Sequence, residues 1–249
     1  MWHSLQAWRG PLLIAGVAAV VLWLYFSGNL SLYIHPRYHL FTAVMSVIAV
    51  VAVVIGTGYQ ASRPDDEHDE HDSGSKVAFV ASTVLSVGTL LALILIPPAT
   101  LGTTTVDNRA INQSGLGDTQ TVLDQAESGD ATVFASFTVR EWAGILRQTQ
   151  DPAFFRGKPV DTIGFVAADP DNDGVFYLTR FVVSCCSVDA QPVGIPVALT
   201  GWENQFQEET WVRVTGEFTA NSDARQTHPL VVTPTAIEPA EQPDEPYLF

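Results

Sequence analysis

The sequence predicts a membrane-anchored α + β protein, in which three N-terminal transmembrane helices precede a soluble, mainly β domain. Two observations support this fold class. The first hundred of the 249 residues hold three long apolar runs, whereas the remainder has the mixed composition of a soluble domain. Short strand-like runs then recur between turn residues. We therefore expect a transmembrane anchor over residues 1–98, a polar tether over 99–135 and an OB-like small β-barrel over 136–249.

The transmembrane prediction depends on the length of the apolar runs. Pro11–Phe26 is apolar throughout, and with the residues up to Leu30 it reaches about 20 residues, enough to cross a bilayer core of roughly 30 Å. Leu40–Tyr59 and Val77–Ile96 are similar. A cleaved signal peptide is the alternative for the first run, but no small-x-small cleavage site ends it. We expect a multi-pass protein in the lipid bilayer, with spans at about 11–30, 40–59 and 77–96.

The few charges beside these runs indicate an orientation. Arg9, Arg63 and Lys76 flank one side of the predicted spans, and Arg37 and Arg109 flank the other. Basic residues favour the cytoplasmic side of a membrane. This split predicts a cytoplasmic N-terminus and an extracytoplasmic C-terminal domain.

A short turn follows the first apolar run and crowds His35, Pro36 and Arg37 together. One hypothesis is that this turn docks a partner helix or lines an ion path. The alternative is an interfacial turn in which Tyr33 and Tyr38 act as aromatic anchors and Arg37 extends towards water.

An acidic stretch, DDEHDEHD, occupies Asp65–Asp72 between the second and third runs. Carboxylates together with imidazoles are ligands for zinc, copper or nickel, so His68, Asp69, Glu70 and His71 could form a weak metal-collecting loop. Charges of one sign at this density also favour an extended, solvated segment. A plain acidic loop is therefore the alternative, and no pattern here fixes the ligand geometry of a structural site.

The C-terminal part contains one predicted helix followed by predicted strands. Thr138 and Glu141 have the spacing of a capping box, and the apolar residues after them recur at helical intervals, which predicts a helix over Val139–Gln148. Alternating residues from Trp211 to Gly216 are typical of a strand with one buried face. The predicted strands are Pro159–Ala168, Val175–Ser184, Gly194–Ala198, Thr210–Phe218 and Pro229–Glu238.

The stretch DPDNDG, Asp169–Gly174, resembles the opening of an EF-hand calcium loop. Arg180 occupies the position of the closing glutamate, however, and the flanking residues favour strands rather than helices. A tight hairpin turn is the better prediction.

The charge of the protein limits its partners. The formal net charge is −15, and from Pro97 onward 8 Lys and Arg face 21 Asp and Glu. Such a field repels phosphate backbones, so we expect no nucleic-acid binding. A metal ion or a basic protein surface is a more suitable partner for a chain with this negative charge.

Both cysteines of the chain, Cys185 and Cys186, are adjacent, and Asp189 follows them closely. One hypothesis is that both are small buried apolar residues. A second is that the thiolates bind a metal such as zinc together with Asp189 and His228. A third is a strained vicinal disulfide or a redox pair. In a regular strand neighbouring side chains point to opposite faces, so a shared metal requires irregular backbone at the pair.

No motif of a known catalytic centre is present. The sequence lacks G-x-S-x-G, a Walker loop, H-E-x-x-H and a dinucleotide fingerprint. We therefore expect a protein that is not an enzyme.

Five stretches of the chain form a recognisable set of motifs. They are SGNLSLYIHPRY (Ser27–Tyr38), FTVREWAGIL (Phe137–Leu146), GKPVDTIGFV (Gly157–Val166), FYLTRFVVSCCSVDAQPVGIPV (Phe176–Val197) and ETWVRVTGEF (Glu209–Phe218). Through these motifs the chain resembles a bacterial family, the YcgQ-like permease-subunit proteins. The family pattern has an alanine-like residue after the cysteine pair, where this chain has Ser187 and Val188.

This resemblance implies an accessory subunit that partners a separate multi-span membrane permease, with a link to metal handling, zinc included. The metal would bind near Cys185, Cys186 and Asp189. Two other hypotheses stay open. The domain could be a non-catalytic protein–protein interaction module with structural cysteines, or a membrane-tethered thiol redox protein, which would need a low thiol pKa.

Overall fold

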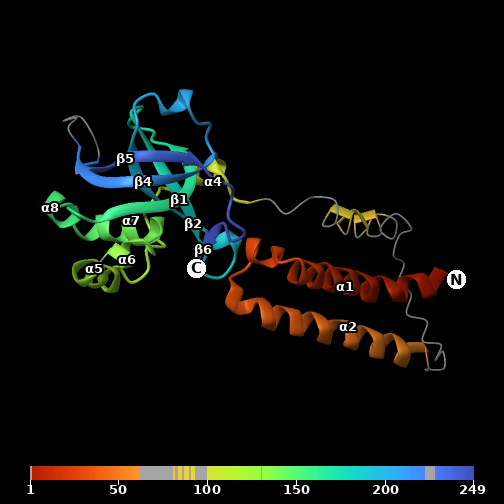
Figure 1. The fold of residues 1–249 in the computed structure, drawn as a ribbon. Coiled ribbons are helices and arrows are strands. Elements are labelled where there is room, and N and C mark those ends of the chain that lie inside the picture. Colours follow the sequence, from red (N-terminus) through yellow and green to blue (C-terminus); the bar gives the residue numbers. More distant parts are fainter. Residues whose placement is uncertain are drawn as a thin grey trace. The chain divides into compact units, whose positions relative to one another are not determined.

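The computed structural model describes residues 2–61, 81, 84–85, 87–89, 91–92, 100–129, 131–221 and 228–249, and Figure 1 shows its helices and strands. The chain divides into two compact units, Met1–Ala99 and Thr100–Phe249. The described part of the first unit is helical, and the second unit combines a mixed β-sheet with short helices.

The first unit contains two long helices, α1 (Trp2–Phe26) and α2 (His39–Ala61), joined by the short 3-10 helices η1 (Asn29–Leu32) and η2 (Pro36–Tyr38). Helix α1 ends at Phe26 because Gly28 follows in the left-handed conformation, with φ of 78°. The chain then reverses, and α1 and α2 lie side by side as a helical hairpin (Figure 1).

The prediction of three transmembrane helices is wrong. Within the described residues, one helical stretch is long and apolar enough to cross a membrane, Pro36–Tyr59, which has 24 residues and a length of about 36 Å. The first predicted span, 11–30, is interrupted after Phe26, so its apolar part, Gly10–Phe26, extends only about 26 Å. Most of the third predicted span, 77–96, lies outside the described residues.

The second unit is built on a six-stranded mixed sheet in the order β1-β4-β5-β3-β2-β6, and β1 also pairs with β2. The five long strands therefore pair in a closed ring. Within the ring β3 and β5 run parallel and the other pairs are antiparallel. The strands are β1 (Pro159–Ala168), β2 (Val175–Val182), β3 (Gln191–Ala198), β4 (Trp211–Ala220), β5 (Leu230–Pro239) and β6 (Tyr247–Leu248).

Strand β4 shows how the sequence pattern places the core. Its buried residues alternate with more exposed ones, as expected of a strand with one buried face. The strand continues past Gly216 to Ala220, with a shift in register between Thr215 and Gly216. A Cβ on Gly216 would lie 2.4 Å from the carbonyl oxygen of Thr233, so the close approach of β5 requires glycine here.

Helix α7 (Val139–Gln148) packs on the ring (Figure 1) and has the bounds that the capping box predicted. Trp142 and Ile145 are fully buried in the core of this unit. The ring of Trp142 packs against those of Phe137 and Phe218, with centroids 5.2 and 5.5 Å away. Burying aromatic side chains of this size stabilises the fold by about 1.5–3 kcal/mol each.

Residues 99–135 were expected to be a polar tether, but the structure places helices there. These are α4 (Thr103–Asp107), α5 (Thr119–Ser128) and α6 (Ala131–Phe134), and α8 (Pro152–Phe155) follows α7. Asp118 caps α5 by accepting hydrogen bonds from the N–H groups of Gln120 and Thr121. Ala126 and Phe134 are buried in the core, so this segment belongs to the folded unit.

Candidate metal centre

The two cysteines lie in a loop between β2, which ends at Val182, and β3, which begins at Gln191. The backbone bends at Ser184 and Cys185 and then enters the 3-10 helix η3 (Ser187–Asp189). Because this backbone is irregular, the two side chains are not forced to opposite faces of a strand. Their Sγ atoms lie 3.4 Å apart, and both thiols are free, with Cys185 exposed and Cys186 half-buried.

Asp189 holds this loop in shape through main-chain hydrogen bonds. Its Oδ1 accepts from the N–H of Ser184 at 3.1 Å and its Oδ2 from the N–H of Cys185 at 2.7 Å. The N–H of Asp189 in turn donates to the carbonyl of Cys186 at 2.9 Å. The carboxylate therefore fixes the backbone that carries both thiols.

Contacts from distant parts of the second unit fix the same loop. The guanidinium of Arg109 donates to the carbonyls of Val188, at 2.8 Å, and Ala190. The N–H of Val183 donates to the carbonyl of Leu248 at 2.9 Å, beside the parallel pairing of β6 with β2. Hydrogen bonds from Arg109 and to Leu248 therefore fix both ends of the cysteine loop.

The loop shifts the pKa values of its thiol and its carboxylate in opposite directions. Partial burial alone would raise the pKa of Asp189. The hydrogen bonds from the Cys185 thiol and from nearby N–H groups outweigh this effect, so the pKa lies below its usual value. The hydrogen bond to Asp189, and then that to Cys186, raises the pKa of the Cys185 thiol to about 12. A metal ion bound here would have to displace that proton.

The loop brings together a set of atoms that fits a metal ion. One ligand atom each from Cys185, Cys186 and Asp189 lies within 4.8 Å of the others. In a tetrahedral zinc site with Zn–S bonds of about 2.3 Å, two sulfur ligands are roughly 3.8 Å apart. The observed 3.4 Å is close to this separation, so small side-chain rotations suffice. The residues fit a zinc-type ion with three protein ligands.

His228, the fourth predicted ligand, is not in this group and belongs to another cluster. Its Nε2 lies 2.9 Å from Oδ2 of Asp169 and 3.1 Å from the hydroxyl of Tyr177. Burial, with the carboxylates of Asp169 and Asp171, raises the pKa of Tyr177. Asp169 is also the first residue of the predicted hairpin turn, and β1 and β2 do pair as an antiparallel hairpin around it.

The remaining predicted site residues lie in the first unit. His35 caps η2 by accepting the N–H of Arg37 on its Nδ1 at 3.1 Å, and the Arg37 guanidinium lies 5.8 Å from the ring centre of Tyr38. The docking role of His35, Pro36 and Arg37 stays a prediction. The predicted metal-collecting loop with His68, Asp69, Glu70 and His71 lies outside the described residues.

Sequence reasoning missed two contributors to these sites. Arg109 is 79 residues from Val188, and no local pattern indicates their contact. Asp169 was recognised only as a turn residue. Its partner His228 is 59 residues away along the chain, so no local pattern indicates this pairing either.

Two family models match the chain. Residues 11–112 match the DUF1980 N-terminal domain, and residues 129–249 match the DUF1980 C-terminal domain. A relative from Streptococcus mutans serotype c (strain ATCC 700610 / UA159) is named "Putative two-component membrane permease complex subunit". It is 23% identical over 271 residues, which cover 96% of this chain and 97% of the relative. The resemblance to permease-subunit proteins is thereby confirmed, and the chain belongs to the DUF1980 family, with its N-terminal and C-terminal domains in order.

Proposed function

We propose that this protein is a non-catalytic accessory subunit of a membrane permease complex, and that its β domain binds a zinc-type metal ion at Cys185, Cys186 and Asp189. The observation that carries the subunit role is the end-to-end match to the Streptococcus mutans protein, whose name describes such a subunit. The partner in this proposal is a separate multi-span permease in a bacterial cell membrane.

The structure supports the two halves of this proposal in different ways. Pro36–Tyr59 offers an apolar helix long enough to cross the membrane, and only 6% of its most apolar window is buried. That exposed apolar surface fits contact with lipid or with the helices of a permease. The cysteine loop supplies three converging ligands, and the negative charge of the protein favours a cationic ligand.

The metal-binding half is tested on the full-length chain in mild detergent under reducing conditions. We expect about one zinc ion per chain by mass spectrometry, and a loss of high-affinity binding in Cys186→Ser and in the Cys185→Ser/Cys186→Ser double variant. Ser187→Ala is the matched control, because it alters the same loop without removing a ligand. Unchanged zinc affinity in Cys186→Ser would contradict the proposed metal site.

The same variants separate this proposal from the interaction-module hypothesis. If the cysteines are structural, replacing both with alanine lowers the free energy of unfolding but leaves transport and zinc content unchanged. The subunit role is tested by co-purification. We expect a multi-span membrane protein in stoichiometric amount with the full chain, and its absence would contradict the role.

A further inference from the structure

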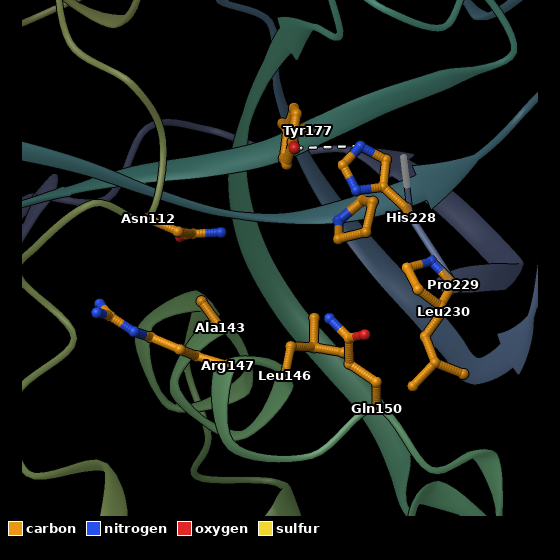
Figure 2. Close-up of a pocket in the computed structure, with 10 residues that line it drawn as sticks. Asn112, Ala143, Leu146, Arg147, Gln150, Tyr177, His228, Pro229 and Leu230 are labelled. Atoms are coloured by element: carbon orange, nitrogen blue, oxygen red, sulfur yellow. Dashed lines mark hydrogen bonds between the residues drawn. The ribbon is translucent and has the colours of Figure 1, made fainter. Parts of the chain in front are cut away.

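The second unit contains a pocket of about 260 Å³ that is separate from the cysteine loop. Figure 2 shows Tyr177 and His228 on one side of it and Leu146, Arg147 and Gln150, from α7 and its end, on the other. A water molecule takes about 30 Å³ in the liquid, so the pocket has room for a small organic molecule.

His228 is held on the wall of this pocket by a buried carboxylate. The side chain of Asp169 is 2% exposed and that of His228 is 18% exposed, and they are 2.9 Å apart. The other oxygen of Asp169 accepts the N–H of Asp171 at 3.1 Å. Because the Asp169 carboxylate accepts, the tautomer with the proton on Nε2 matches this contact, and Nδ1 has no hydrogen-bond partner among the described residues.

The opposite wall supplies donors. Arg147 is exposed, and its guanidinium donates one long hydrogen bond, of 3.4 Å, to the carbonyl of Gln113. Among the described residues of the lining, it is the one permanently charged side chain. The Gln150 amide has no hydrogen bond to any described residue, which leaves its N–H groups available to a ligand.

Apolar side chains complete the lining. Leu146, Pro196 and Leu230 offer a surface for a hydrocarbon body. A cation is disfavoured, because the carboxylate behind the wall, Asp169, is covered and already accepts two hydrogen bonds. Hydrogen-bond donors beside apolar side chains match a ligand that has several hydrogen-bond acceptors at one end and an apolar body.

We infer that this pocket binds a small organic carboxylate, whose carboxylate accepts hydrogen bonds from Arg147 and Gln150 while its apolar body lies against Leu146 and Leu230. The ring of His228, fixed by Asp169, packs against the apolar body of the ligand from the opposite wall. This site is independent of the metal site proposed above and shares no residue with it.

Benzoate and its neutral isostere benzamide are the probes, measured by ligand-observed NMR on the full-length chain in detergent. We expect benzoate to bind and benzamide to bind about tenfold more weakly, because a hydrogen bond between charged groups exceeds a neutral one by such an amount. Arg147→Gln should weaken benzoate binding about tenfold. Arg156→Gln, an exposed arginine outside the pocket, is the matched control and should leave the affinity unchanged.

A second variant, His228→Gln, tests the opposite wall and should also weaken benzoate binding. Arg147 is exposed, so its variant keeps the test valid even if His228→Gln lowers the stability of the fold. Equal affinity for the two probes, no binding of benzoate at millimolar concentration, or unchanged affinity in Arg147→Gln would each overturn the inference. The Cys185→Ser/Cys186→Ser variant should retain benzoate binding, which separates failure here from failure of the metal site.

Discussion

Asp189 determines the behaviour of the cysteine loop at the scale of single residues. Its oxygens accept two main-chain N–H groups, and it also accepts a hydrogen bond from the Cys185 thiol. The sequence identified Cys185, Cys186 and Asp189 as a group because they are close along the chain. Their hydrogen bonds depend on the bend after β2, which residue spacing alone does not predict.

The raised pKa of Cys185 predicts slow alkylation. Thiolate is the reactive form, and with a pKa of about 12 the thiol is almost fully protonated at pH 8. We expect iodoacetamide to modify Cys185 more slowly than a free peptide thiol at this pH, in a Cys186→Ser chain. Asp189→Asn removes the charged acceptor and should speed the reaction. A rate above that of the free thiol would instead favour the redox hypothesis.

A surface ion pair predicts a small pH-dependent term in stability. Nε of Arg213 lies 2.6 Å from Oδ1 of Asp161, and the side chains are 52% and 36% exposed. The hydrogen bond from Arg213 lowers the pKa of Asp161 below 3.8, so the pair stabilises the fold above that pH and its contribution disappears as the pH falls through the lowered pKa.

Arg213→Gln should therefore cost about 0.2–1 kcal/mol of unfolding free energy at pH 7, and less at acidic pH. Urea unfolding at both pH values measures the difference. A cost that grows as the pH falls below 3.8 would contradict this assignment.

At the scale of elements, strong local patterns predicted structure well. Thr138 and Glu141 form the predicted capping box at the start of α7. The five predicted strands are present as β1 to β5, because turn residues separate the apolar runs, although only β4 alternates buried and exposed residues along its length. Helix α5 was missed because its polar residues outweigh a short apolar stripe, although Asp118 is a typical cap. Strand β6 has two residues and no pattern of its own.

Arg180 joins the C-terminal segment to the sheet. It donates to the carbonyls of Glu245 and Pro246 at 2.5 and 3.1 Å, and burial lowers its pKa to about 10. Arg180→Met keeps the volume but removes both donors, so we expect a loss of about 2–4 kcal/mol and faster proteolysis of the C-terminal segment. Denaturant unfolding measures the loss, with exposed Arg156→Met as control. A cost below about 0.5 kcal/mol would show that water replaces these donors.

At the scale of the whole molecule, the composition of the chain distinguished an apolar N-terminal part from a mixed C-terminal part but overestimated the number of spans. Apolar length alone cannot show that α1 ends before Gly28, which is why the sequence predicted a membrane span over residues 11–30. The separation of His228 from the cysteines was likewise hidden, since it depends on the pairing of β3 and β5.

The sidedness of the β domain is a prediction at this scale. With Pro36–Tyr59 as the span, Arg37 and Arg63 lie near its two ends, so their charges balance and a direct measurement decides. The measurement uses Glu203→Cys in a Cys185→Ser/Cys186→Ser chain, and its reaction with a membrane-impermeant maleimide in intact cells would place this domain outside the cytoplasm, as the sequence predicts. Glu203 is exposed on the second unit. Labelling only after lysis would place this domain in the cytoplasm.

The bracing of the cysteine loop by Asp189 and Arg109 has a calorimetric consequence. Metal sites that form only as the chain folds bury apolar surface on binding and therefore show a large negative heat-capacity change. Here the loop geometry is already fixed by main-chain hydrogen bonds. The heat of metal binding should accordingly vary little with temperature, as in a rigid receptor whose main cost is dehydration of the ion.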